Sequence, residues 1–308
     1  MTGVLLINMG SPLSKKEMRQ FLFNMFSDKA ILPFPKIPRT LLAFMISTFR
    51  HSGSWKKYQQ IGGSKLKESM KLINEQLASE IGKDYVVTSA YSYSKPGIQE
   101  GVEMLRDKGI KDIRVITMYP HSAYSTTESV KTDLAKVQKK YPELKMTELG
   151  TYGENEFFIN YWVDIIQKTI DKYGYKQPTL VFSAHAIPQY NVDAGDTYVE
   201  EIKASAQLIS ERLGVAHRVA FQSKIGRIKW VDPDTKDYLK TMKNEGIDEI
   251  MLVPISFVNE NLETAYDQGC EIVPYGQNEL KFQYICRVEI PASHPQLIAT
   301  FINLLAKA

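Results

Sequence analysis

The chain of 308 residues is long enough for about two domains of ordinary size. Its composition, 44% hydrophobic and 24% charged, excludes a disordered or collagen-like protein, and a net charge of +3 does not indicate nucleic acid as a partner. Two cysteines, Cys270 and Cys286, are too few for a disulfide framework or an iron–sulfur cluster and fit a reducing compartment. No apolar run approaches the length of a membrane span and no signal-peptide pattern opens the chain, so we expect a soluble, cytoplasmic protein.

Short apolar runs alternate with longer segments of helical period. The runs are continuous rather than alternating, as expected for parallel strands covered on both faces, and fall at 4–9, 85–89, 113–118, 180–183, 219–222 and 250–253. Helices are predicted near 65–82, 97–108, 125–140, 156–172, 198–213, 234–245 and 295–306. This order predicts the α/β class, with parallel β-sheets flanked by helices.

The chain also resembles itself. Residues 4–12 are similar to residues 180–188, at an offset of 176, and residues 109–113 are similar to residues 246–250, at an offset of 137. The first half therefore holds 39 more residues than the second between these landmarks. We predict two similar halves, 1–152 and 153–308.

The extra residues are expected within about 13–63, a segment crowded with large apolar side chains such as Phe21, Phe23 and Phe34. Three prolines between 33 and 38 are expected to break any long helix there. The segment is either a buried tie within its domain or an apolar lip around a flat hydrophobic ligand that also touches a membrane. Lys29 and Lys36 add positive charge that suits anionic headgroups.

Few residues are placed for chemistry. His121 and His185 each follow a predicted strand, and ligands bind outside the carboxyl ends of parallel strands. Glu260 and Glu263, after the strand at 250–253, are predicted on neighbouring positions of a helical turn. A structural histidine and a helix start with acidic residues are the ordinary explanations. One imidazole with one or two carboxylates could instead hold a divalent metal or move protons, whereas no nucleotide-binding or acyl-transfer motif is present.

Four motifs in order resemble the ferrochelatase family, whose members insert iron(II) into a porphyrin, and the resemblance runs along the whole chain. The most specific is Ser-Ala-His-x-(Leu/Ile)-Pro, which matches residues 183–188. The others match residues 221–226 with Trp230, residues 119–127, and residues 257–264.

The resemblance implies two Rossmann-like halves with an active-site cleft between them, the metal-site residues lying in the second half. His185 and Glu263 match the family's metal-site pair and Glu260 a further acidic position, and these three are expected to be catalytic. Met9, which the internal repeat aligns with His185, matches a position facing the macrocycle. The remaining expected porphyrin-binding residues are Tyr58, Ser64, Tyr93, Tyr124 and Trp230.

The sequence departs from the family pattern at several points. Asn261 stands where animal members have histidine, so this position cannot ligate a metal strongly. Ser64 is followed by Lys65 rather than proline, which weakens the inferred contact at Ser64. Asp196 in Gly195-Asp196-Thr197 lacks the proline that customarily follows it. The cysteine-bearing extension of some members is absent, so we expect no iron–sulfur cluster and no permanently bound cofactor, with iron(II) as a substrate.

The resemblance thus implies a lyase of haem biosynthesis whose partners are a porphyrin and ferrous iron. The lip and Met9 favour protoporphyrin over coproporphyrin, because coproporphyrin-type members tend to have tyrosine at this position. The alternatives are a cobalt or nickel tetrapyrrole chelatase and a porphyrin or haem carrier without catalysis. The lip also predicts peripheral contact with the inner face of a membrane, and no nucleic acid partner is expected.

Overall fold

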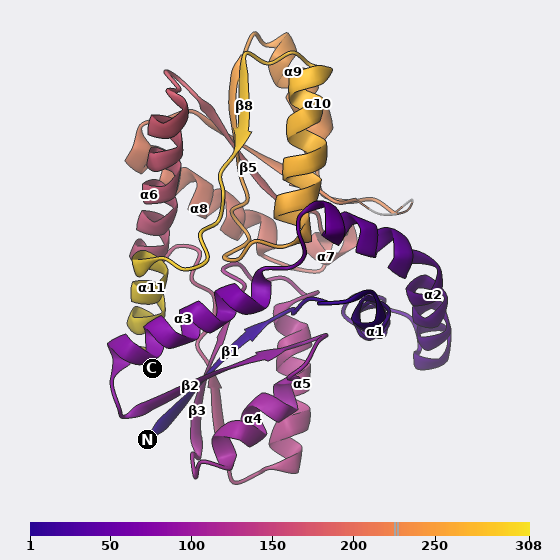
Figure 1. The fold of residues 1–308 in the computed structure, drawn as a ribbon, viewed down its shortest axis with the longest axis vertical. Helices are drawn as coiled ribbons and strands as arrows, with labels where there is room; N and C mark the ends of the chain where they lie inside the picture. Colours follow the sequence, from indigo (N-terminus) through magenta and orange to yellow (C-terminus); the bar gives the residue numbers. More distant parts are fainter. Residues whose placement is uncertain (225, 227) are drawn as a thin grey trace. The chain divides into compact units, whose positions relative to one another are not determined.

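The computed structural model describes residues 1–224, 226 and 228–308, which form two compact units (Figure 1). Unit 1 comprises Met1–Tyr119, Ala123–Thr151 and Phe301–Ala308, and unit 2 comprises Pro120–Ser122 and Tyr152–Thr300. The last eight residues thus belong to the unit that contains the N-terminus. Ile225, within the family motif at residues 221–226, lies outside the described residues.

Unit 1 is built on a parallel sheet whose strand order is β2-β1-β3-β4. The strands are β1 (Thr2–Asn8), β2 (Tyr85–Tyr91), β3 (Asp112–Thr117) and β4 (Lys145–Glu148). Residues 4–7 of β1 are fully buried, which explains the unbroken apolar run in a central strand covered on both faces. The short edge strand β4 is more polar and was not predicted.

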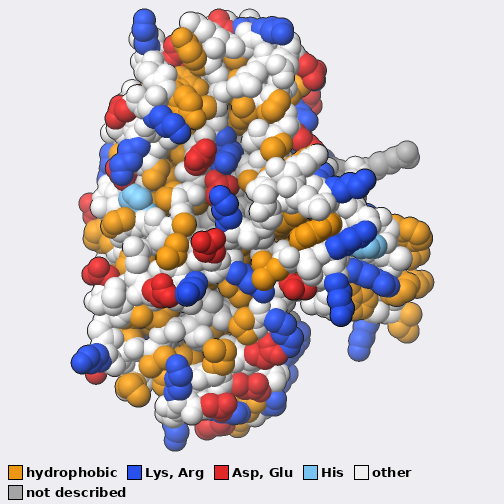
Figure 2. Space-filling model, in the orientation of Figure 1, with side chains coloured by type: hydrophobic (Ala, Val, Ile, Leu, Met, Phe, Trp, Pro, Cys, Tyr) orange, Lys and Arg blue, Asp and Glu red, His pale blue; other side chains and the backbone are white. Residues whose placement is uncertain are grey.

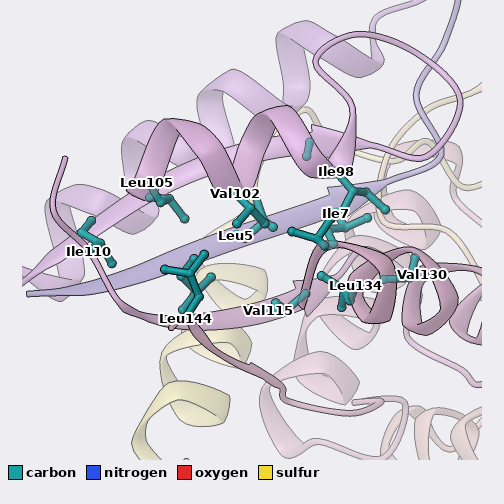
Figure 3. Close-up of a cluster of buried hydrophobic side chains, with 13 residues drawn as sticks. Leu5, Ile7, Ile98, Val102, Leu105, Ile110, Val115, Val130, Leu134 and Leu144 are labelled. Carbon is teal, nitrogen blue, oxygen red and sulfur yellow. The ribbon is translucent and has the colours of Figure 1, made fainter. Parts of the chain in front are cut away.

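Helices α3 (Leu66–Ile81), α4 (Ile98–Arg106) and α5 (Thr127–Lys140) accompany this sheet. Apolar side chains of α4 and α5 meet those of β1 and β3 in one cluster, shown in Figure 3. Gly101 allows α4 to approach the sheet closely, because a Cβ there would lie 2.7 Å from Cβ of Ala90. Burial of this apolar surface stabilises the unit.

Unit 2 repeats the plan with the strand order β6-β5-β7-β8, again all parallel. Its strands are β5 (Thr179–His185), β6 (His217–Gln222), β7 (Glu249–Val253) and β8 (Tyr284–Arg287). Its helices are α6 (Glu156–Tyr173), α7 (Gln189–Asp193), α8 (Tyr198–Leu213), α9 (Thr235–Asn244), the π-helix η1 (Glu263–Ile272) and α10 (Val273–Asn278). The final helix α11 (Pro295–Ala306) begins in unit 2, and its residues from Phe301 onward count with unit 1.

The strand registers bear out the internal repeat. Gly3 pairs with Ile113 in unit 1, and Thr179 pairs with Ile250 in unit 2. These two pairs are related by the same offsets, 176 and 137, that the sequence repeat predicts. Met9 and His185 therefore occupy equivalent positions at the carboxyl ends of β1 and β5.

The additional residues of the first half form two helices, α1 (Lys15–Phe26) and α2 (Lys36–Gln60). The expectation that the prolines break any long helix is wrong, since α2 runs for 25 residues. Pro35 precedes its first residue and Pro38 lies in its first turn, where a backbone N–H has no partner within the helix. The prolines therefore mark where the helix begins.

Candidate functional site

His185 is the last residue of β5, at the carboxyl edge of the sheet in unit 2. Its Nδ1 lies 2.6 Å from the carbonyl oxygen of Ala186. Because a carbonyl can only accept, Nδ1 carries the hydrogen and donates it. In the neutral form of the ring, the lone pair then lies on Nε2, the atom that can take a proton or bind a metal. The side chain is 36% exposed.

Glu263 is the first residue of η1, and Asn261 fixes this helix start. The backbone N–H groups of Glu263 and Thr264 donate to Oδ1 of Asn261 at 2.9 and 3.1 Å, and the N–H of Asn261 donates to Oγ1 of Thr264 at 3.0 Å. This reciprocal cap satisfies backbone donors that the helix leaves unpaired. Asn261, at the position where animal members have histidine, thus has its side-chain oxygen occupied by the backbone.

His185 and Glu263 face each other, with 3.9 Å between Nε2 and Oε2. Burial raises the pKa of Glu263, while the nearby His185 works in the opposite direction. Oε2 is buried and accepts no hydrogen bond from the described residues. The pair therefore holds an imidazole lone pair and an unpartnered carboxylate oxygen, both of which can bind a divalent cation or relay a proton.

Glu260 is placed differently from the sequence expectation, because it precedes η1 instead of sharing a helical turn with Glu263. Its Oε1 accepts from Nη1 of Arg287 at 2.5 Å and from the N–H of Ile290 at 2.9 Å. Its Oε2 accepts from Oγ1 of Thr264 at 2.6 Å. A carboxylate with these three donors holds the loop before η1, and both of its oxygens are occupied.

Sequence reasoning missed the polar side chains behind His185. Gln222 is the last residue of β6 and pairs with His185 in the sheet, and the N–H of Ala186 donates to its carbonyl at 2.8 Å. Ser183 donates from Oγ to Oε1 of Gln222 at 3.0 Å and lies 3.0 Å from Oγ1 of Thr235. Gln222 lies in the family motif at residues 221–226, but a sequence pattern cannot show where a buried amide points.

Trp230 bridges to Pro188 in an antiparallel pair, which brings the tryptophan motif beside the histidine motif. His121 is in a different environment. It is buried, its Nε2 lies 2.9 Å from Oγ of Ser205, and burial lowers its pKa to about 3. A Cβ on Gly153 would come within 2.6 Å of this ring. His121 therefore fits the structural explanation, packed inside unit 2.

The other predicted porphyrin-binding residues all lie in unit 1. Met9 is half-buried just beyond β1, and Tyr58 is buried on α2 and stacks on Trp55 with ring centroids 6.3 Å apart. Ser64 accepts at Oγ from the N–H of Leu66 at 3.3 Å, at the start of α3. Tyr124 is exposed in the loop before α5.

Tyr93 is buried, and its hydroxyl donates to Oδ2 of Asp28 at 2.8 Å. Ser129 of α5 donates to the same oxygen, and the N–H of Ala30 donates to Oδ1 at 2.8 Å. Asp28 lies between α1 and α2, so this carboxylate holds the inserted helices against the body of unit 1. The Tyr93 hydroxyl is therefore engaged in a structural contact.

No group of three or more His, Cys, Asp or Glu side chains that could hold a metal gathers anywhere in residues 1–224, 226 and 228–308. The structure thus offers a two-residue pair at His185 and Glu263.

Solved structures place the fold among chelatases. The cobalt complex of the sirohydrochlorin chelatase SirB from Bacillus subtilis subspecies spizizenii matches with a TM-score of 0.62 at 12% identity, covering 99% of this chain and 94% of that one. At this identity the likeness concerns the fold alone.

Sequence comparison defines the family. The Ferrochelatase family model matches residues 1–308. The ferrochelatase of Desulfotalea psychrophila is 36% identical over 86% of this chain and 85% of its own length. That of Aquifex aeolicus is 29% identical over 98% of both. The chain belongs to the ferrochelatase family.

Proposed function

We propose that the protein is a lyase that inserts iron(II) into a porphyrin to form haem. The observation that carries the proposal is the apposition of His185 Nε2 and Glu263 Oε2 at the carboxyl edge of the unit 2 sheet. The family supports the reaction, and the pair supplies the groups that the reaction needs.

Metallation exchanges two pyrrole protons for one iron(II), so the protein must accept protons and strip water from the metal. The Nε2 lone pair of His185 can take a pyrrole proton because Nδ1 already carries the ring hydrogen. Glu263 can replace water on iron(II) or pass the proton on, since its Oε2 has no other described hydrogen-bond partner. No redox change of the metal is required.

The substrate that we propose is protoporphyrin. Met9 places an uncharged thioether at the strand end equivalent to that of His185, and α1 and α2 add apolar surface, which suits a macrocycle with few charged substituents. The test is a comparison of iron insertion into protoporphyrin and coproporphyrin, followed by absorbance. A higher kcat/KM with coproporphyrin would overturn this choice of substrate and leave the chelatase proposal intact. Binding of a porphyrin without metallation would instead identify a carrier.

We also propose that α1 and α2 bring the protein to the surface of an anionic membrane. Ile37 and Phe49 on α2 are 83% and 82% exposed, and Phe34, Leu41 and Phe44 are also exposed. Residues 13–63 carry nine Lys and Arg against two Asp and Glu, a net charge of +7 in a chain whose total is +3. Figure 2 shows basic side chains beside apolar ones on this projection at the right. Exposed apolar groups flanked by positive charge suit the headgroup region of an anionic bilayer.

Not all of this segment is exposed. Phe21 and Leu22 are buried, and α1 packs along α2. The buried side chains fit the buried-tie explanation, and the exposed ones on other faces of these helices support the proposed lip. No helix among the described residues combines the length and apolarity needed to cross a bilayer, so the proposed contact is peripheral.

The membrane proposal is tested with the double variant Ile37→Ser, Phe49→Ser. Binding to vesicles that contain anionic lipid is expected to fall at least about tenfold, since two large apolar side chains are each worth about 1.5–3 kcal/mol when buried. The matched control replaces Leu72 and Met104, which are exposed apolar residues of α3 and α4, by Ser. Equal vesicle binding by both double variants would overturn the proposal, as would a large fall in Tm confined to the α2 variant.

A further inference from the structure

The family motif at residues 221–226 contains a serine with a strained backbone that the proposed mechanism does not use. Ser223 follows the last residue of β6, and its φ of 65° lies in the left-handed region. Among the described residues other than glycine, only Ser223 and Lys281 have a positive φ. This conformation is unfavourable for any residue with a Cβ. Such strain persists where the surrounding structure holds it, and it gathers at functional sites.

The side chain of Ser223 connects this strained position to the helix that carries Glu263. Its Oγ donates a hydrogen bond to Oδ2 of Asp267 at 3.2 Å. Asp267 lies on η1 four residues after Glu263, which is close to one turn of a π-helix. The hydrogen bond therefore joins the carboxyl end of β6 to the first turn of η1.

A second hydrogen bond attaches the same turn of η1 to β5. Gln268 is fully buried, and its Nε2 donates to the carbonyl of Ser183 at 3.4 Å. Ser183 lies two residues before His185 on β5, and β5 pairs with β6 in the sheet. Two adjacent residues of η1 are thus bonded to two neighbouring strands, one of which carries the histidine.

The start of η1 is held by other contacts. The cap at Asn261 joins residues within its own segment, and Glu260 attaches the preceding loop to Arg287 of β8. The hydrogen bonds one turn later run instead to β5 and to the end of β6. They therefore fix where η1 lies relative to His185.

We propose that Ser223 is a positioning residue, whose hydroxyl holds η1 through Asp267 so that Glu263 stays opposite His185. The role rests on the proposed metallation reaction and deepens it. The 3.9 Å between Nε2 of His185 and Oε2 of Glu263 depends on where η1 lies on the sheet. Groups that orient a metal-binding side chain from outside typically change affinity or activity by about 10–100-fold when removed.

The test separates the hydroxyl from the backbone strain with the variants Ser223→Ala and Ser223→Gly. Both lack the hydroxyl, so kcat for iron insertion should fall about tenfold in each. The porphyrin KM should stay within about twofold of wild type, because only the metal-binding pair is disturbed. Glycine alone relieves the strain, so Ser223→Gly should have a higher Tm than Ser223→Ala. A purely structural role would instead make kcat follow Tm.

Lys281→Gly is the matched control. Lys281 has a φ of 57° and lies in unit 2 between α10 and β8. Its carbonyl accepts from Nζ of Lys243, and glycine keeps that carbonyl. This variant relieves the same kind of strain, so its Tm should rise while its kcat stays at the wild-type value.

A double-mutant cycle shows whether Ser223 acts through Asp267. In an Asp267→Ala background, Ser223→Ala should lower kcat no further, because the acceptor of the hydrogen bond has been removed. Zn²⁺ binding in the absence of porphyrin, measured by calorimetry, supplies a readout that does not depend on turnover. The Zn²⁺ affinity of Ser223→Gly should be about tenfold weaker than that of Lys281→Gly.

A wild-type kcat in Ser223→Gly, or an equal fall in kcat on Ser223→Ala with and without Asp267, would overturn the inference while wild-type iron insertion stands. Absence of iron insertion by the wild type would instead remove the proposed function. The Zn²⁺ affinities would then decide the inference, and equal values for Ser223→Gly and Lys281→Gly would overturn it.

Discussion

The ring of His185 is fixed by one short hydrogen bond, from Nδ1 to the carbonyl of Ala186, so its chemistry is concentrated at Nε2. Replacement of His185 by Ala should lower kcat for iron insertion at least about 100-fold, because general acid–base groups contribute about 10²–10⁴-fold. The side chain is partly exposed, so the far-ultraviolet spectrum and Tm should stay near those of wild type.

His217→Ala is the matched control, since His217 begins β6 and thus lies at the amino edge of the same sheet. It should leave turnover unchanged. Near-normal iron insertion by the His185 variant would show that another group accepts the pyrrole proton.

Glu263 and Glu260 are close in sequence, but replacing each by Gln should have different effects on stability and on iron insertion. Burial raises the pKa of Glu263, so the folded protein binds its proton more tightly than the unfolded chain. The free energy of unfolding then falls as the pH rises from the ordinary carboxyl value through the raised pKa. Glu263→Gln should remove this loss, so at neutral pH it should keep or raise Tm while nearly abolishing iron insertion.

Glu260→Gln removes the charge that pairs with Arg287. The expected result is a loss of about 1.5–3 kcal/mol in the free energy of unfolding by urea, the usual range for hydrogen bonds to charged groups, with a smaller effect on kcat. If Glu260→Gln lost activity as completely as Glu263→Gln at unchanged stability, Glu260 would have to be counted among the reacting groups.

At the scale of elements, the start of η1 decides where Glu263 points. Asn261→Ala removes the acceptor for two backbone N–H groups and should cost about 1 kcal/mol of stability, with a fall in kcat as Glu263 loses its fixed place. Asn261→Asp keeps the acceptor and should retain the stability. Chemical denaturation and initial rates of both variants check this, and equal behaviour of the two would show that capping is not the role of Asn261.

The central strands could be predicted because both faces of each are buried, which leaves a continuous apolar run. The edge strands β4 and β8 could not, since Lys145–Glu148 and Tyr284–Arg287 mix polar and apolar residues over four positions. The π-helix η1 could not be predicted either, because i→i+5 hydrogen bonds are not associated with a distinct residue pattern. Pro38 was misread because proline costs little in the first turn of a helix.

The candidate site was likewise predictable only in part. Motifs located His185 and Glu263, and the fold brings them together. Whether a polar group is free to react depends on hydrogen-bond partners that are distant in the chain. Glu260 is bonded to Arg287, Tyr93 to Asp28 and His121 to Ser205. Sequence spacing does not reveal these partners, so it could not separate reacting groups from structural ones.

At the scale of the whole molecule, His121 should make folding sensitive to acid. Burial lowers its pKa to about 3, so the unfolded chain binds this proton more readily than the folded protein below about pH 6.5. Stability should therefore fall as the pH drops from 6.5 toward 3, by at most about 1.4 kcal/mol per pH unit from this group. In urea unfolding between pH 7 and 4, His121→Gln should be less stable at pH 7 but lose less on acidification.

His51→Gln, at a half-exposed histidine of α2, is the control and should follow the wild-type dependence on pH. If the free energy of unfolding of His121→Gln fell with pH as steeply as that of the wild type, the acid sensitivity would arise from other groups.

The shared registers of the two sheets have a consequence for the history of the chain. Equal strand orders with matching offsets are what the duplication of an ancestral gene of about half this length would leave behind. In such an ancestor one codon would have specified both strand ends that Met9 and His185 now occupy. After duplication the copies could diverge, one keeping an imidazole and the other a thioether that cannot take a proton at neutral pH. The insertion of α1 and α2 into only one copy is a second mark of that divergence, and each half became free to evolve under its own selection.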